Sequence, residues 1–238
     1  MVRGLVVLAL AMTPFAALAG AQGRGLVHAR HVIGHSVRGR PIVAVESGNP
    51  RSPRRIVVVG CIHGDEPAGI AIARILESAR PSNAFDLWIV EDLNPDGVAL
   101  GTHQNADGVD LNRNFPWQWE REGRGRLTDS GPSALSEPES RAMRAFLLRL
   151  RPHLVVWYHQ PFGVVDESGG SPAVERRYAQ LVGMSLRRLP RYSGSATSWT
   201  NAAFPGATSF VVELPPGPLP QAAARRHAST VLALAAGS

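Results

Sequence analysis

The sequence predicts an α/β fold: a single domain built on a mixed, mostly parallel twisted sheet flanked by helices on both faces. Two observations support this prediction. Four runs rich in Val, Ile and Leu each end in polar residues, namely RIVVVGCIH, DLWIVEDLN, HLVVWYHQ and SFVVELP. Continuous apolar runs are typical of strands buried on both faces, and segments with helical periodicity alternate with them.

The remaining elements are expected in chain order. The stretch RHVIGHSVRGRPIVAVESG should form an edge hairpin with a turn at Arg38-Gly39. EPAGIAIARILESAR has helical spacing of apolar residues, and SEPESRAMRAFLLRLR should open with a capping box of Ser136 and Glu139 around Pro138. SPAVERRYAQLVGMSLRRL and LPQAAARRHASTVLALAA complete the expected helices.

Two segments, residues 95–128 and 192–206, are rich in Gly, Asn, Ser and Pro. This composition is typical of irregular chain rather than of a helix or strand interior. Because long loops in a compact domain frequently carry function, we expect both to be functional loops rather than linkers.

The first residues, MVRGLVVLALAMTPFAALAGAQG, are typical of an export signal. Arg3 precedes an apolar stretch from Leu5 to Ala19 and small residues at which a signal peptidase would cut. Residues 1–21 are therefore expected to be a signal peptide and residues 22–238 the mature domain. The stretch is too short for a membrane span, which needs about 20 apolar residues. We expect no membrane span, and a location that is secreted, periplasmic or associated with the cell wall.

The charge of the chain is strongly basic. The formal net charge is +6, all basic side chains are arginines, and removal of Arg3 leaves 6 − 1 = +5. A basic surface suits anionic surroundings such as cell-wall polymer. Charge alone would serve nucleic acid equally, but the chain has no RNA-binding or DNA-binding motif, so no nucleic-acid partner is expected.

Cys61 is the only cysteine, which excludes a disulfide within the chain. It lies at a predicted strand end beside Ile62. We expect it to be a small buried hydrophobic residue rather than a nucleophile.

Polar side chains lie at or just beyond the ends of the four predicted strands: His63, Asn94, His159 and Glu213. In an open α/β sheet, ligands bind in the crevice outside the carboxyl ends of the strands. The sequence therefore predicts that these residues contribute to one site.

Three of the polar residues have the spacing of a catalytic metal site. His63 and Glu66 lie three positions apart in one tight turn, and His159 follows 159 − 66 = 93 residues later. Catalytic zinc typically takes three protein ligands from His, Asp or Glu and leaves one position for water. An HxxE pattern by itself is a weak signal, because it also occurs in surface turns and helix caps.

Glu213 follows an apolar strand in the sequence VVEL. Burial there would raise its pKa toward the range useful for proton transfer. The alternative is an ion pair between this carboxylate and one of the many arginines.

Several motifs fall in the order of a known family: HGDE at 63–66, NPDG at 94–97, GVDLNRNFP at 108–116, SEPE at 136–139, WYHQ and VVELP. With them the chain resembles the zinc carboxypeptidases of the carboxypeptidase A type, and within these the small murein peptide amidase-like branch. The resemblance extends from about Gly34 to Pro215.

The resemblance implies one Zn2+ per chain, held by His63, Glu66 and His159, and Glu213 as the general acid/base. It also implies that Asp110 orients the first histidine. Asn112 and Arg113 match the pair that binds the terminal carboxylate of the substrate.

The implied activity is that of a secreted zinc metallocarboxypeptidase, a monomer, that hydrolyses a C-terminal peptide or amide bond by metal-activated water. Its expected substrate is a short peptide with a free carboxylate, and bacterial cell-wall peptides containing D-Glu and diaminopimelate are the favoured class.

Two positions depart from the family pattern or match it weakly. His103 stands nine residues before Asn112, where the family has an arginine that stabilises the oxyanion. Either His103 takes this role, another arginine substitutes, or activity is low. Tyr192 lies 213 − 192 = 21 residues before Glu213, roughly where relatives place a tyrosine over the substrate. A packing aromatic is the preferred interpretation of Tyr192.

Two other functions remain open from the sequence. A zinc-dependent deacylase of N-acyl amino acids would use the same HxxE and distant histidine. A catalytically weak wall-binding protein on the same fold would explain His103, although the intact metal ligands argue against it.

Overall fold

The computed structural model describes residues 25–237, and the expected signal peptide, residues 1–21, lies outside them. The described strands are β1 (Val27–His35), β2 (Pro41–Gly48), β3 (Arg55–Val59), β4 (Asp86–Val90), β5 (Leu154–His159), β6 (Val164–Asp166), β7 (Ser185–Arg187) and β8 (Thr208–Glu213). The described helices are α1 (Ala68–Glu77), α2 (Pro95–Leu100), α3 (Pro138–Leu150), α4 (Pro172–Val182), α5 (Ala196–Ala203), α6 (Gln221–Ala236) and the 3-10 turn η1 (Leu111–Arg113).

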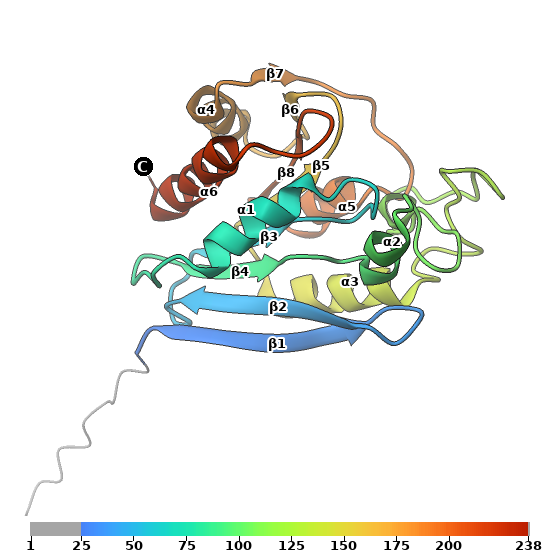
Figure 1. The fold of residues 1–238 in the computed structure, drawn as a ribbon, viewed down its shortest axis with the longest axis horizontal. Coiled ribbons are helices and arrows are strands. Elements are labelled where there is room, and N and C mark those ends of the chain that lie inside the picture. Colours follow the sequence, from blue (N-terminus) through green and yellow to red (C-terminus); the bar gives the residue numbers. More distant parts are fainter. Residues whose placement is uncertain (1–24, 238) are drawn as a thin grey trace, which may run out of the picture.

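The eight described strands belong to one sheet, in the order β1-β2-β4-β3-β5-β8-β6-β7. The central strands β4, β3, β5 and β8 are parallel to their neighbours within this group. The β1–β2 hairpin joins β4 in antiparallel fashion at one side, and β6 joins β8 in the same way at the other. The predicted mixed, mostly parallel sheet is confirmed, and Figure 1 shows the edge hairpin below the central strands.

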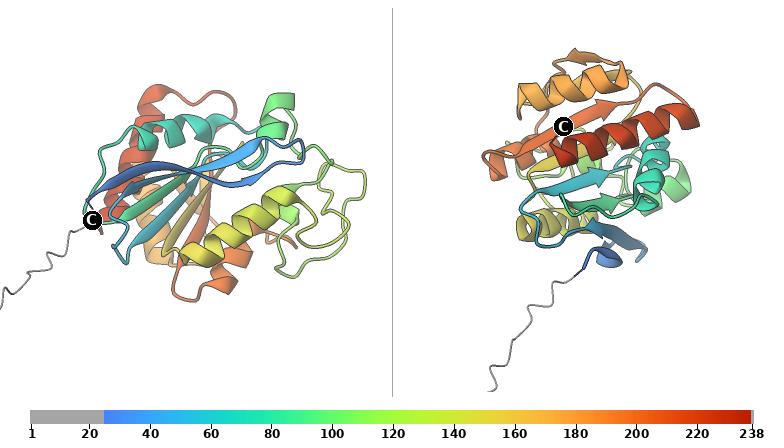
Figure 2. Two further views of the ribbon diagram at one scale, coloured as in Figure 1. Left: turned by 90° about the horizontal axis from the view of Figure 1, so that it is seen from below. Right: turned by 90° about the vertical axis from the view of Figure 1, so that its left-hand side faces the viewer.

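Helices cover both faces of the sheet, because alternate side chains of the central strands point to opposite sides. On β3, Ile56 and Val58 belong to a buried cluster with side chains of α1, α4 and α6. Val57 and Val59 belong to a second cluster with side chains of α3 and α5. Figure 2 shows the twisted sheet between these two helical layers.

The four apolar runs and the hairpin turn are confirmed, whereas shorter elements were missed. Gly39 has φ +75° in the turn between β1 and β2. Two segments predicted as loops contain α2, η1 and α5. The helix predicted to continue through MSLRRL ends at Val182, because Gly183 adopts φ +74° and the chain continues into β7.

The capping box predicted for α3 is wrong. The helix does begin at Pro138, but its N-cap is Glu137, which makes no side-chain capping bond. The Glu139 carboxylate is buried instead, where it accepts hydrogen bonds from the Val37 backbone N–H (3.0 Å) and from Asn105 Nδ2 (3.1 Å). Contacts with distant segments therefore replace the local cap.

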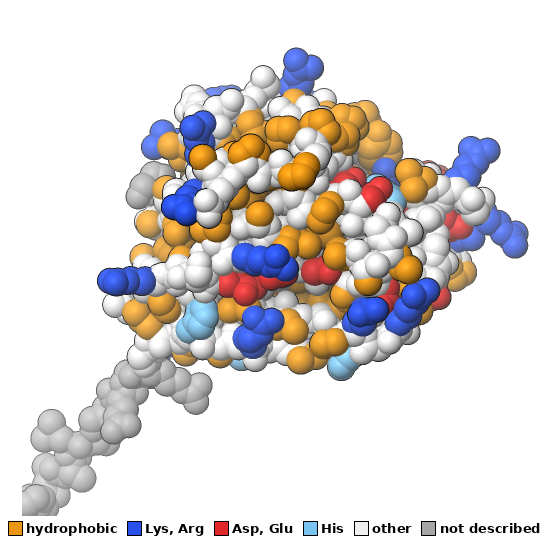
Figure 3. All heavy atoms as spheres, in the orientation of Figure 1, with side chains coloured by type: hydrophobic (Ala, Val, Ile, Leu, Met, Phe, Trp, Pro, Cys, Tyr) orange, Lys and Arg blue, Asp and Glu red, His pale blue; other side chains and the backbone are white. Residues whose placement is uncertain are grey.

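The charged side chains on the surface agree with the basic composition of the sequence. Arginine side chains are scattered over the face shown in Figure 3, with acidic side chains among them. Cys61 is fully buried, and its Sγ contacts the carbonyl oxygen of His63 at 3.0 Å, as expected for a structural thiol. Within residues 25–237, no helix has the length and hydrophobicity needed to cross a membrane.

A buried polar chain connects the helices on one face to the sheet. The hydroxyl groups of Tyr158 on β5 and Tyr178 on α4 lie 2.7 Å apart, and the Tyr178 hydroxyl is hydrogen-bonded to Nδ1 of His227 on α6 at 2.8 Å. Burial, together with repulsion from Arg226, lowers the pKa of His227 from 6.5 to about 4. The neutral imidazole is therefore the form that the fold accommodates.

We predict that His227 makes the protein sensitive to acid. The unfolded chain binds this proton near pH 6.5 and the folded chain only near pH 4, so the free energy of unfolding falls as pH drops across this window. Denaturant titrations at pH 7.5 and 4.5 should show a loss in the wild type on the order of 2 kcal/mol larger than in His227→Gln, whose amide keeps a hydrogen-bonding partner for Tyr178. Equal losses in both proteins would contradict the prediction.

Candidate metal centre

The turn after β3 and the end of β5 bring the predicted metal ligands together. His63 and Glu66 lie between β3 and α1, and His159 is the last residue of β5, which pairs in parallel with β3. The turn passes close to α2: a Cβ on Gly64 would lie 1.9 Å from the carbonyl carbon of Gly97. Glycine in the HGDE motif is thus required by the close approach of two backbones.

The three donor atoms form a compact triangle. His63 Nδ1 lies 3.1 Å from Glu66 Oε2, His159 Nδ1 lies 3.1 Å from the same oxygen, and the two Nδ1 atoms are 3.2 Å apart. Zinc binds nitrogen and oxygen at about 2.0–2.2 Å in tetrahedral geometry, which requires ligand separations of about 3.3 Å. The residues present therefore fit a zinc ion.

Asp110 fixes the orientation of the first histidine. His63 Nε2 donates to Asp110 Oδ1 at 3.0 Å, which directs Nδ1 toward the other two metal donors. Asp110 is fully buried at the start of η1, and its Oδ1 also accepts the backbone N–H of Asn112 at 2.8 Å. The structure thus places the Asp110 carboxylate against His63, the histidine that the resemblance expects it to orient.

The electrostatics of the centre keep its carboxylates ionised. Burial opposes ionisation of Glu66, but hydrogen bonds from His159 and His63 outweigh it and lower the pKa of Glu66 well below its usual range. Burial likewise opposes ionisation of Asp110, but attraction to His63 together with the histidine hydrogen bonds outweighs it and lowers the pKa of Asp110. Burial lowers the pKa of His63, yet Asp110 and Glu66 raise it to about 10, so metal binding there displaces a proton.

Gln160 is a site residue that the sequence interpretation missed. Its backbone N–H donates to Glu66 Oε2 at 3.0 Å, and its side-chain oxygen accepts the N–H of Ala68 at the start of α1. Its Nε2 donates to the carbonyl oxygens of Pro215 and Gly217 beyond β8. Gln160 therefore ties three segments of the site together; its position directly after the strand-end His159 was the available signal.

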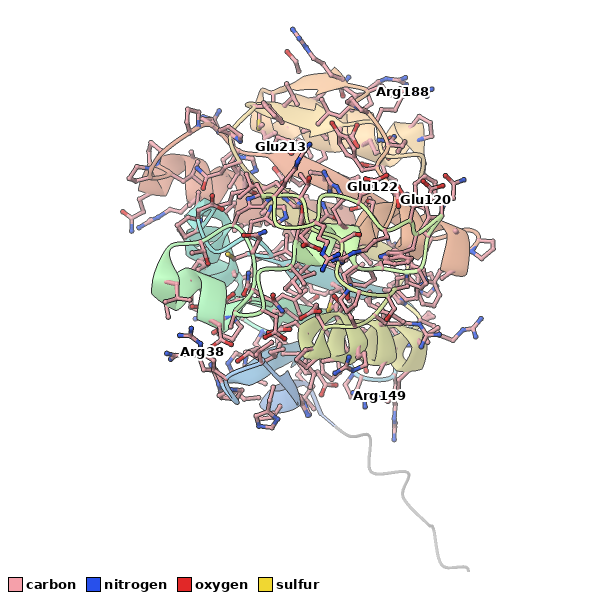
Figure 4. All side chains as sticks on the ribbon, turned by 90° about the vertical axis from the view of Figure 1, so that its right-hand side faces the viewer. Arg38, Glu120, Glu122, Arg149, Arg188 and Glu213 are labelled. Carbon is pink, nitrogen blue, oxygen red and sulfur yellow. The ribbon has the colours of Figure 1, made fainter. Side chains whose placement is uncertain are left out.

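Glu213 lies beside the metal ligands at the end of β8. Its Cα is paired with that of His159 across the parallel β5–β8 ladder. Burial raises its pKa, and its Oε2 is buried with no hydrogen-bond partner among the described residues. Figure 4 shows Glu213 inward of the peripheral side chains of Arg38, Arg149 and Arg188.

His103 contacts the metal ligands directly. Its ring stacks on that of His63 with centroids 3.7 Å apart, and its Nδ1 lies 3.1 Å from Asp65 Oδ1. Asn94, in contrast, does not line the site. It caps α2 by accepting the Gly97 N–H, and its Nδ2 approaches the carbonyl oxygen of His103 at 3.5 Å.

Asn112 and Arg113 lie together on η1. Asn112 Oδ1 accepts the backbone N–H of Ala196 at 3.0 Å, which leaves the NH2 group of the amide available to a ligand. The Arg113 guanidinium carbon lies 4.2 Å from the ring centroid of Tyr192, a cation–π contact. Tyr192 is 48% exposed, so its interpretation as a packing residue is corrected: it stacks on Arg113 at the cleft rather than in a hydrophobic core.

One cleft of about 700 Å³ contains the predicted site. It is lined by all three expected metal ligands, by Glu213 and His103, and by Asn112, Arg113 and Tyr192. Asp166, Ser168, Arg191 and Thr197 form a polar part of the same lining. Arg191 Nη1 pairs with Asp166 Oδ2 at 2.9 Å, and Asp166 Oδ2 also accepts the Ser168 hydroxyl at 2.6 Å.

The sequence of this chain is similar to those of zinc carboxypeptidases. The zinc carboxypeptidase family model matches residues 24–174. Murein peptide amidase A of Vibrio campbellii is 32% identical over 150 residues, which cover 58% of this chain and 60% of that protein. Murein peptide amidase A of Escherichia coli is 31% identical over 147 residues, with 56% and 60% covered. The matched region thus spans about 60% of the length of these curated relatives.

Solved structures share the fold. A murein-tripeptide amidase from Escherichia coli superposes with a TM-score of 0.71 at 24% identity, over 91% of this chain and 95% of that chain. Carboxypeptidase A from Helicoverpa armigera superposes with a TM-score of 0.73 at 20% identity, over 89% and 69%. Both similarities agree with the α/β architecture described above.

We predict that Gly194→Ala disturbs the side of the cleft that holds Arg113. Gly194 has φ +73°, and a Cβ there would lie 1.9 Å from the carbonyl oxygen of Arg113. Strain and overpacking together should lower the free energy of unfolding on the order of 3 kcal/mol. Thermal and denaturant unfolding measure this loss.

Gly206→Ala is the matched control for this prediction. Gly206 also has a positive φ, +91°, but no atom of the described residues lies within 4 Å of the point that its Cβ would occupy. It should show only the backbone strain of about 1 kcal/mol. Equal losses at the two glycines would show that the contact with Arg113 is not what requires Gly194.

Proposed function

Because the chain belongs to the zinc carboxypeptidase family, we propose that it is a secreted, zinc-dependent hydrolase that cleaves a C-terminal peptide or amide bond in short peptides. The observation that carries the proposal is the composition of one cleft. The cleft is lined by three metal donors and by a pair of groups suited to bind a carboxylate. It is also lined by the Glu213 carboxylate, whose buried Oε2 has no hydrogen-bond partner among the described residues. Secretion rests on the export signal expected at residues 1–21.

The proposed substrates are bacterial cell-wall peptides. This choice is supported by the two murein peptide amidase relatives. The cleft lining is mixed, because Asp166, Ser168 and Arg191 contribute polar groups while Phe162 and Val211 contribute apolar side chains. The polar groups suit the carboxylate and amine groups of a cell-wall peptide.

Arg113 and Asn112 bind the free carboxylate of the substrate in this proposal. The guanidinium presents a planar pair of N–H donors, and the Asn112 amide presents its NH2 group beside it. The stack on Tyr192 holds the guanidinium plane in place. This arrangement sets the register of the peptide, with its terminal bond over the metal ligands.

Glu213 moves the proton. Zinc bound by His63, Glu66 and His159 would lower the pKa of a coordinated water and polarise the scissile carbonyl. The raised pKa of Glu213 suits its Oε2 to accept the water proton and to return it to the leaving amine. His103 occupies the sequence position at which the resembling family has an oxyanion-stabilising arginine, and its Nδ1 lies 3.1 Å from Asp65 Oδ1 beside the metal ligands.

We predict chelator-sensitive hydrolysis. The mature protein, residues 22–238, incubated with digested wall peptides and a mixed peptide panel, should release a C-terminal unit that mass spectrometry identifies. A metal chelator should abolish the release, and added Zn2+ should restore it. Release that persists without metal would contradict the proposal, and cleavage of N-acyl amino acids alone would point to a deacylase.

We predict that Glu213→Gln removes catalysis and preserves binding. The amide matches the carboxylate in size but cannot accept the water proton, so kcat should fall roughly a hundredfold to ten-thousandfold. Binding of wall fragments, measured by calorimetry, should stay within a few fold of the wild type. If both proteins bind equally and neither releases product, the chain is a binding protein on this fold.

A further inference from the structure

His103 repeats the arrangement of the metal ligand His63. The two rings stack at 3.7 Å, tilted by 22°, and the two histidines share the same two carboxylates. His63 Nε2 faces Asp110 Oδ1 at 3.0 Å, and His103 Nε2 faces Asp110 Oδ2 at 3.7 Å. His63 Nδ1 faces Glu66 Oε2 at 3.1 Å, and His103 Nδ1 faces Glu66 Oε1 at 3.7 Å. Each histidine thus has one oxygen of each carboxylate.

Asp65 supplies a further donor on the side of His103. Its Oδ1 lies 3.1 Å from His103 Nδ1, and the ligand atoms of Asp65, Glu66 and His103 all lie within 4.8 Å of one another. Two carboxylates and one imidazole are suitable ligands for Zn2+, Mn2+ or Co2+. Asp65 has 44% of its side chain exposed, so water can complete the coordination shell.

The orientation of His103 favours this use. The Oδ2 atom of Asp110 is buried and has no hydrogen-bond partner within residues 25–237, and His103 Nε2 and Arg113 Nη1 lie near it at 3.7 and 3.8 Å. With a cation bound, the single ring proton of His103 lies on Nε2 and faces this oxygen, and Nδ1, which is 3.1 Å from Asp65 Oδ1 in this structure, presents its lone pair to the cation between Asp65 and Glu66. The same device presents Nδ1 of His63 to the first metal.

We propose that Asp65, Glu66 and His103 bind a second divalent cation, and that the Glu66 carboxylate bridges it to the zinc held by His63, Glu66 and His159. The proposal rests on the proposed function, because the first metal belongs to it. The second site is the weaker of the two, since its ligands are more exposed and its contacts are longer. A cation there stands at the position where the resembling family carries an oxyanion-stabilising arginine.

Metal stoichiometry tests the proposal. Metal-free protein is dialysed against a series of buffered free Zn2+ concentrations, and zinc per chain is measured by elemental analysis; a Co2+ absorption titration provides a second readout. The wild type should bind two ions in two steps. Asp65→Asn and His103→Gln should each bind one, with the first step unchanged.

Asp107→Asn is the matched control, because Asp107 is an exposed carboxylate of the same loop as His103 that does not line the cleft. It should bind two ions. Asp65 is itself exposed, so Asp65→Asn tests the site even if His103→Gln impairs folding, which circular dichroism would show.

Each other outcome rejects the second site. A wild type that stops at one Zn2+, or an Asp65→Asn variant that still binds two, overturns it. One ion together with chelator-sensitive hydrolysis would leave the proposed function standing without the second cation. No bound metal at any concentration would overturn both.

Discussion

The parallel pairing of β3, β5 and β8 is the constraint on which the rest of this structure depends. Their side chains are buried on both faces, so the backbone groups must be satisfied within the sheet and the register is strongly specified. This pairing puts the ends of the three strands at one edge, where His159 and Glu213 become neighbours. A shift of one residue would turn His159 to the opposite face and remove it from His63 and Glu66.

The cost of this arrangement is electrostatic. Glu66 and Asp110 are removed from water, and each remains ionised only because histidine nitrogens and backbone N–H groups surround it. Gln160 has both an electrostatic and a structural role. Its backbone N–H stabilises the charge of Glu66, and its side chain is hydrogen-bonded to the start of α1 and to the chain beyond β8. A cluster of this kind is poorly suited to a structural role and well suited to holding cations.

The substrate side of the cleft is assembled differently, from loops that are distant in sequence. The backbone N–H of Phe115 donates to the carbonyl oxygen of Gly194, and the N–H of Gly194 donates to that of Trp117. These bonds hold the segment carrying Tyr192 against the segment carrying Arg113. The cation–π contact between them is thus a consequence of backbone pairing rather than of a local motif.

Much of the fold was predictable because its signals are local. Long apolar runs determine the buried strands, and helical spacing determines α1, α3, α4 and α6. The three-residue strands β6 and β7 carry too short a pattern to predict, and α5 was hidden in a Ser-rich segment although Ser195 caps it. The capping box failed because Glu139 has stronger partners in Val37 and Asn105, which are remote in sequence.

The sequence by itself determined the types and order of the groups in the cleft, since the motifs around His63, Asp110, His159 and Glu213 carry them in the chain. It also determined which strand ends would present them. Only the tertiary structure decided that His103 stacks on His63, that Asp65 joins it, that Tyr192 covers Arg113 and that Gln160 secures Glu66. These contacts join segments far apart in the chain, and their geometry depends on how the loops between the strands pack, which no local pattern records.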